Sequence, residues 1–226
     1  MEEVLMKCGF DRLDITPILP VRLSGFGKVR WANEIHDPIM ARLFLFKGEE
    51  ENLLIQLDLV AVDDLLYTMI EKKTGIKKDR IVLMATHTHS GPVGTLDTTK
   101  GALNGLDSIF GEVNTNYCEC IADQVSDSVN HLRECLQPFT YRILKGKVEG
   151  LGTDRHDPSL PYDEDMLLIE FKLADGKRAL LTRMSCHPTV MNQENCCVTA
   201  DFPGAIEPLF PEYQQVAYVN GSCGNM

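Results

Sequence analysis

The residues best suited to chemistry are two histidines, His87 and His89, in the segment His-Thr-His-Ser-Gly-Pro at positions 87–92. They follow an apolar run at residues 81–85 that has the composition of a β-strand. Side chains two positions apart on a strand point to the same face, so we expect the two imidazoles to converge. We predict a metal site at the end of this strand, because imidazole is the commonest metal ligand. The alternative is a hydrogen-bonded pair of histidines in a rim loop.

A third histidine, His187, repeats this layout. It ends a second predicted strand at residues 178–186 and is followed by Pro188 and Thr189. Ligands at the ends of separate strands can meet at one edge of a sheet, where α/β proteins place their sites. By itself His187 is only a histidine at the end of a strand. With His87 and His89 it supplies the three protein ligands of a catalytic zinc site, which keeps a further position open.

Five separated motifs occur in the order and approximate spacing of one enzyme family. They are Gly25-Phe26-Gly27, His36-Asp37-Pro38-Ile39-Met40-Ala41-Arg42-Leu43, Ala85-Thr86-His87-Thr88-His89-Ser90-Gly91-Pro92, Cys186-His187-Pro188-Thr189 and Thr199-Ala200-Asp201-Phe202-Pro203-Gly204. On these residues the chain resembles the N-terminal part of the neutral/alkaline (non-lysosomal) ceramidases over nearly its whole length. The block that contains His87 and His89 is the most specific of the five.

The resemblance implies roles for four residues. His87 and His187 match zinc ligands of the family, and His89 matches a histidine at the catalytic centre that positions or polarises the scissile amide. Arg155 matches an arginine that faces the site. The implied activity is that of a zinc-dependent hydrolase that cleaves an N-acyl amide bond with metal-activated water, on a small-molecule or lipid-like substrate.

The chain departs from the family pattern near residue 226. A predicted strand at residues 215–219 leads to Asn220-Gly221-Ser222-Cys223-Gly224-Asn225-Met226, where the family carries Gly-Asp-Val-Ser-Pro with a catalytic serine. The family's remaining zinc ligands, a glutamate and a tyrosine, lie further on. We therefore expect either a truncated or split enzyme or a site completed by local residues such as Asp201, Asp58 or Glu194.

Alternative functions follow from the same departure. The chain could be a non-catalytic or incomplete half-enzyme that acts as a binding or interaction module, with exposed apolar surface where a missing polypeptide or a second copy packs. A metallo-β-lactamase-type hydrolase is less favoured, because Gly91 and Pro92 stand where that family has Asp-His. A serine hydrolase is less favoured still, because no G-x-S-x-G motif occurs.

Composition limits the partners. The chain has 226 residues, 44% of them hydrophobic, and a net charge of −11 from 33 acidic and 22 basic residues. We expect one domain over residues 1–226, no nucleic-acid partner and no binding to anionic membranes. No signal sequence or membrane-spanning run is visible, which predicts a cytoplasmic protein without stable membrane insertion. The eight cysteines are expected to be thiols, with Cys8, Cys135, Cys186 and Cys223 in the core.

Hydrophobic periodicity predicts an α/β fold of mixed β-sheets, two of them packed together and flanked by helices. The expected helices are residues 64–74, capped by Asp63 and ended by Gly75, then 115–136, with an apolar stripe, and 202–209, beginning at Asp201. The expected strands are residues 4–10, 39–46, 52–62, 81–85, 141–148, 166–173, 178–186 and 215–219. Residues 93–113 are expected to form a lid or a flexible loop.

Two acidic residues have competing interpretations. Asp58 interrupts an apolar run, where a charge is costly unless it is paired. It either holds the second ring nitrogen of a ligating histidine or bonds the backbone of a loop. Asp201 is either a helix cap or a metal ligand, and the cap is favoured. His131 lies on the polar side of the long helix and is excluded from any site.

Overall fold

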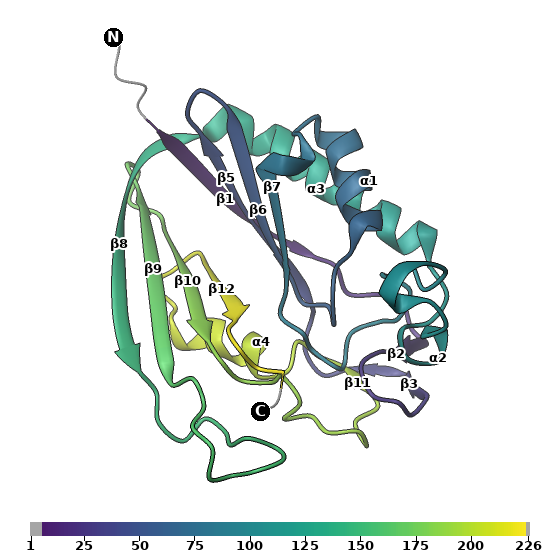
Figure 1. Ribbon diagram of the computed structural model, residues 1–226. Coiled ribbons are helices and arrows are strands. Elements are labelled where there is room, and N and C mark those ends of the chain that lie inside the picture. Colours follow the sequence, from purple (N-terminus) through teal and green to yellow (C-terminus); the bar gives the residue numbers. More distant parts are fainter. Residues whose placement is uncertain (1–5, 225–226) are drawn as a thin grey trace.

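A single eight-stranded mixed sheet forms the centre of the computed structural model, which describes residues 6–224 (Figure 1). The strand order is β12-β10-β9-β8-β1-β5-β6-β7. In chain order these strands are β1 (Lys7–Asp14), β5 (Met40–Lys47), β6 (Glu51–Leu57), β7 (Ile81–Ala85), β8 (Gln137–Lys147), β9 (Asp165–Leu173), β10 (Arg178–Met184) and β12 (Gln215–Asn220). The predicted α/β class with mixed sheets is confirmed.

The large sheet folds over on itself and so makes two packed layers. Strands β1 and β8 pair only at their first residues, Lys7 with Pro138 and Cys8 with Gln137, and then diverge. The rings of Phe10, Phe44 and Phe171 fill the space between the two halves. The two packed sheets expected from the sequence are therefore two halves of one sheet.

Helices α1 (Asp64–Thr74) and α3 (Thr115–Cys135) cover the outer face of the half formed by β1, β5, β6 and β7 (Figure 1). Helix α1 has the predicted ends, since Asp63 accepts a hydrogen bond from the Leu65 amide and Gly75 adopts φ 72°. The predicted apolar stripe of α3 is fully buried; it consists of Ile121, Val125, Val129 and Leu132. Burial of this stripe fixes the helix to the sheet.

Smaller elements complete the fold around the strand ends. Two short sheets pair β2 (Val21–Leu23) with β3 (Arg30–Ala32) and β4 (Glu34–Ile35) with β11 (Cys197–Val198). These strands are too short to show periodicity, and the sequence did not predict them. The remaining helices are α2 (Asp107–Phe110), α4 (Phe202–Ile206) and the 3₁₀ turns Lys78–Arg80, Gly101–Leu103 and Glu207–Leu209. The helix predicted over residues 202–209 thus exists as α4 followed by a 3₁₀ turn.

Three expectations need correction. The predicted strand at residues 52–62 ends at Leu57, and the next five residues leave the sheet. Residues 4 and 5 of the first predicted strand lie outside the described residues, and that strand continues to Asp14. Of the four cysteines expected in the core, Cys8 is buried, Cys186 and Cys223 are half-buried, and Cys135 is exposed at the last residue of α3.

The loop over residues 93–113 is tied together at its base. The Gly94 amide donates to the Phe110 carbonyl at 2.8 Å, and the Asn114 amide donates to the Gly94 carbonyl at 2.9 Å. The loop holds α2 and one 3₁₀ turn. Its role as a lid stays a prediction.

A buried charge network joins the sheet to the C-terminal part of the chain. Asp58 is fully buried and Arg42 is 3% exposed. Arg42 bonds Asp58 at 3.0 Å and Glu207 at 2.9 Å, and the Gln56 amide donates to Asp58 at 2.9 Å. Asp58 also accepts from the Met40 amide at 2.9 Å. Removal of one partner from such a pair leaves an uncompensated buried charge.

We expect Arg42→Met to lower the free energy of unfolding by about 3–5 kcal/mol, because Asp58 then stays buried without its cation. Chemical denaturation of the full chain measures the loss. The matched control is Asp123→Ala, which removes the exposed partner of Lys73 and is expected to leave the denaturation midpoint nearly unchanged. Equal midpoints for the two variants would contradict a supporting role for the network.

Candidate metal centre

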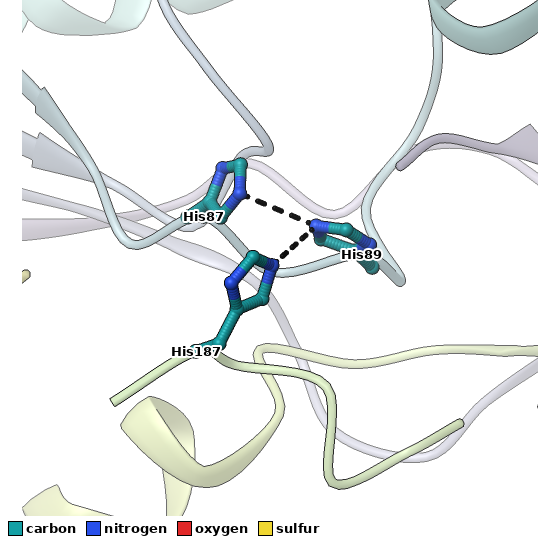
Figure 2. A group of neighbouring side chains, drawn as sticks. All are labelled: His87, His89 and His187. Atoms are coloured by element: carbon teal, nitrogen blue, oxygen red, sulfur yellow. Dashed lines mark hydrogen bonds between the residues drawn. The ribbon is translucent and has the colours of Figure 1, made fainter. Parts of the chain in front are cut away.

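Three histidine side chains converge on one point between the two halves of the sheet (Figure 2). His87 and His89 follow β7, and His187 follows β10. The Nε2 atom of His89 lies 3.3 Å from that of His87 and 3.1 Å from that of His187. One nitrogen from each ring lies within 4.8 Å of the others. The structure therefore brings together all three histidines that the sequence singled out.

The backbone at His87 explains this convergence, and it differs from the strand geometry that we expected. Strand β7 ends at Ala85, and His87 has a φ of 72°, in the left-handed region. The His87 amide still donates to the Leu59 carbonyl at 3.0 Å. The two imidazoles meet because the chain turns at His87, and not because side chains alternate along a strand. A non-glycine residue in this conformation is uncommon and marks a constrained position.

Backbone carbonyls fix the tautomers of two of the rings. The Nδ1 atom of His87 lies 2.5 Å from the Val60 carbonyl, and that of His187 lies 3.0 Å from the Cys223 carbonyl. A carbonyl oxygen only accepts, so each Nδ1 carries a proton, and in its neutral form each ring presents an unprotonated Nε2. This is the arrangement of a histidine prepared to bind a metal.

Asp58 does not hold a histidine ring, which corrects one of its two predicted roles. Its two oxygens bond Arg42, Gln56 and the Met40 amide. It thus stabilises the backbone just after β6, two residues before Val60, whose carbonyl accepts from His87. The Nδ1 partners of His87 and His187 are backbone carbonyls, which carry no sequence signal.

His89 is packed against the loop that contains Gly25 and Phe26. The rings of Phe26 and His89 meet edge to face, with their centroids 4.8 Å apart. Gly25 has a φ of 92°, and a Cβ atom there would clash with the His89 ring. Glycine is required at this position by both the backbone conformation and the close approach.

Arg30 joins this loop to His89, and no sequence motif indicated this role. Its side chain is 3% exposed, and the guanidinium lies 4.6 Å over the Phe26 ring. It donates to the carbonyls of Ser24 at 2.8 Å, of Asn195 at 3.0 Å and of His89. A buried cation that bonds three carbonyls from three segments holds His89 in place.

Burial and neighbouring charge favour the neutral forms of His89 and His187. Partial burial, then the proximity of His87, His187, Arg30 and Arg155, lowers the pKa of His89 to about 3. Burial also lowers the pKa of His187, although its bond to the Cys223 carbonyl opposes this. The Nδ1 atom of His89 is buried and has no hydrogen-bond partner among the described residues. Neutral imidazoles with converging Nε2 atoms are donors for a cation, so the residues present fit a metal ion such as zinc.

A profile of the family described as neutral/alkaline non-lysosomal ceramidase, N-terminal, matches residues 6–221 of the chain. The chain belongs to this ceramidase family. Among solved structures, it is similar to the neutral ceramidase from Pseudomonas aeruginosa, with a TM-score of 0.83 and 20% identity, over 99% of this chain and 39% of that one. It is also similar to a ceramidase complexed with C2, with a TM-score of 0.79 and 20% identity, over 99% of this chain and 38% of that one. The chain thus spans about two fifths of the ceramidases whose fold it shares.

Arg155 lines the same pocket as His89. The resemblance to the ceramidases had indicated this arginine as a site residue. The pocket has a volume of about 530 Å³. It is lined by Gly25, Phe26, Gly27, His89, Arg155, Thr189, Asn192, Gln193 and Glu194. The positive charge of Arg155 acts on both His89 and His187. An exposed arginine beside the histidines is placed to attract an anionic group in the pocket.

The acidic residues considered as further ligands lie in other interactions. Asp201 caps α4 through the Phe202 amide at 2.7 Å and accepts from the Met191 amide at 2.8 Å, which confirms the cap interpretation. Glu194 pairs with Lys28 at 3.2 Å. Within residues 6–224, the only group of side chains close enough to hold a metal consists of the three histidines.

The low pKa of His89 predicts a pH dependence of stability in the metal-free protein. Below about pH 6.5 the unfolded chain binds a proton at this histidine and the folded chain does not, so the free energy of unfolding falls as pH falls. We expect His89→Gln to make this fall shallower, by up to about 1.4 kcal/mol per pH unit between about pH 6 and 5. Urea denaturation at several pH values in the presence of a chelator measures the slope.

His131→Gln is the matched control, because His131 is exposed on α3. It is expected to keep the slope of the wild type. If His89→Gln also keeps that slope, His89 is not the neutral histidine that the structure indicates.

Proposed function

We propose that this chain supplies the histidine part of a zinc-dependent hydrolase site that cleaves an N-acyl amide bond. The observation that carries the proposal is the convergence of three Nε2 atoms, two of which belong to rings whose Nδ1 atoms bond backbone carbonyls. Membership of the ceramidase family supports a hydrolase of amide bonds. His87 and His187 are the proposed metal ligands.

The chemistry divides between the metal and the chain. When bound, zinc lowers the pKa of a water molecule and polarises an acyl carbonyl. His89, neutral at physiological pH and fixed by Arg30 and Phe26, presents its ring to the pocket, where it can hydrogen-bond the amide. Arg155, on the same pocket, places positive charge where the amide oxygen gains negative charge.

The substrate that fits this proposal is a small-molecule or lipid-like N-acyl amide. Among the described residues no helix is long and apolar enough to cross a bilayer. We also propose a cytoplasmic setting, because all eight cysteines are free thiols.

A second candidate is an incomplete half-enzyme that needs another polypeptide or a second copy of the chain. One observation favours it: strand β8 carries two exposed apolar side chains on the same face, with Tyr141 65% and Ile143 51% exposed. Such a surface can bind a partner. A monodisperse monomer that binds no hydrophobic dye would contradict this candidate.

Metal content separates the roles of the histidines. We expect about one zinc per chain in the wild type and none in His87→Ala or His187→Ala, because each variant loses a ligand. His89→Ala is expected to keep zinc and to lose at least about 100-fold in the rate of amide hydrolysis. Plasma mass spectrometry of the purified chain and an N-acyl amide assay measure the two quantities.

His131→Ala, an exposed histidine outside the cluster, is the control for nonspecific loss of metal. Loss of zinc from His89→Ala would make His89 a third ligand rather than a catalytic group. If the wild-type chain takes up no zinc, the proposed metal site is wrong, and the incomplete half-enzyme is the candidate that remains.

A further inference from the structure

We propose that Tyr218 and Asn220 of β12 form a clamp that sets the distance between His87 and His187. Both are positioning residues, since neither belongs to the histidine cluster. The inference rests on the proposed function, because it concerns the same metal site.

The first half of the clamp is the hydroxyl of Tyr218. This side chain is 1% exposed and packs edge to face on Phe202, with the ring centroids 5.1 Å apart. Its hydroxyl lies 2.7 Å from Oδ1 of Asn220 and 3.2 Å from the carbonyls of Met184 and Cys186. Oδ1 and the two carbonyls only accept, so the hydroxyl proton is shared among them, and the shortest of these bonds goes to Asn220. Cys186 immediately precedes His187.

The second half is the amide of Asn220. Its Nδ2 donates to the Thr86 carbonyl, and Thr86 immediately precedes His87. One continuous chain of hydrogen bonds therefore runs from Thr86 through Asn220 and Tyr218 to Cys186. The two residues at its ends are the backbone neighbours of the two proposed metal ligands.

The topology explains why side chains are needed for this task. Strands β7 and β12 are the two ends of the eight-stranded order, and the described strands show no backbone ladder between them. Strand β12 pairs with β10 in parallel, so it moves with His187, while His87 belongs to the opposite half of the sheet. Folding of the sheet brings β7 and β12 close together, but no backbone ladder between these two described strands fixes their spacing. The bond from Asn220 to Thr86 crosses this junction.

A zinc site requires its ligand atoms to be positioned accurately. Zinc binds histidine nitrogen at about 2.0–2.1 Å, and a usable site holds its ligands within about 0.2 Å of such values. Backbone shifts at Thr86 or Cys186 move an imidazole directly. Loss of groups that orient metal ligands typically weakens metal binding about 10–100-fold, and we expect an effect of this size from the clamp.

The test uses the full chain with Zn²⁺ alone and Co²⁺ alone as probes. Tyr218→Phe removes the hydroxyl, and Asn220→Asp keeps an acceptor for Tyr218 but cannot donate to the Thr86 carbonyl. The matched control is Tyr213→Phe, whose hydroxyl bonds Glu170 at 2.7 Å in the same half of the sheet and away from the histidines. We expect Zn²⁺ affinity at least about 10-fold weaker in both clamp variants and unchanged in the control.

The Co²⁺ absorption spectrum is the readout that a merely structural role does not move. It reports ligand geometry, and we expect its visible bands to shift in folded Tyr218→Phe and Asn220→Asp and to stay as in the wild type in Tyr213→Phe. Circular dichroism identifies the variants that are folded. If Tyr218→Phe does not fold, Asn220→Asp alone provides the test. Wild-type affinity and spectrum in a folded clamp variant would overturn the clamp.

A metal-free measurement keeps failure of the clamp distinct from failure of the proposed function. The rings of His87 and His187 lie with their centroids 4.7 Å apart, which predicts a nuclear Overhauser effect between them. If the wild type binds neither Zn²⁺ nor Co²⁺, the proposed metal site fails, and this effect decides the clamp. Its loss in Asn220→Asp with retention in Tyr213→Phe supports the clamp, and its retention in Asn220→Asp overturns it.

Discussion

Two hydrogen bonds between imidazoles and backbone carbonyls determine the chemistry of this site. Because His87 donates from Nδ1 to Val60 and His187 donates from Nδ1 to Cys223, both rings present Nε2 lone pairs toward His89. A carboxylate in either position would add negative charge to a small site, whereas a carbonyl fixes the tautomer without adding a full charge. The neutral donor set leaves room for the charge of a metal and for the charge that develops on a substrate.

Each carbonyl lies in the same half of the sheet as the histidine that it holds, and folding of the central sheet brings the two histidines together. Val60 lies just after β6 in one half, and Cys223 lies just after β12 in the other. Phenylalanine rings fill the space between the halves, and burial of their surface supplies the general driving force for closure. The network around Arg42 makes the closure specific, because it joins β5 and β6 to Glu207 near the C-terminal strand. Closure by apolar contacts alone would leave the strand ends free to slide, and buried charges that must meet restrict that freedom.

The surroundings of the cluster are asymmetric. His89 has Phe26, Gly25 and Arg30 packed around it, while His87 and His187 are held mainly through their own Nδ1 atoms and backbones. This asymmetry agrees with the different roles proposed for them. A ligand needs an oriented lone pair, whereas a group that acts on substrate needs a fixed ring next to an open pocket, and His89 is the histidine that lines the pocket with Arg155.

The sequence by itself determined the local elements and the identity of the three histidines. Helix α1 between Asp63 and Gly75, the buried stripe of α3 and strand β7 follow from caps, periodicity and strand composition, which are short-range effects of sterics and burial. The tertiary structure alone decided the turn at His87, the carbonyl partners of the rings, the pairing of Asp58 with Arg42, and the approach of Asn220 to Thr86. These contacts join distant positions: His89 and His187 are 98 residues apart, and Thr86 and Asn220 are 134 apart. A carbonyl is present at every residue, so its use as a partner depends on where the folded chain places it and leaves no trace in the sequence.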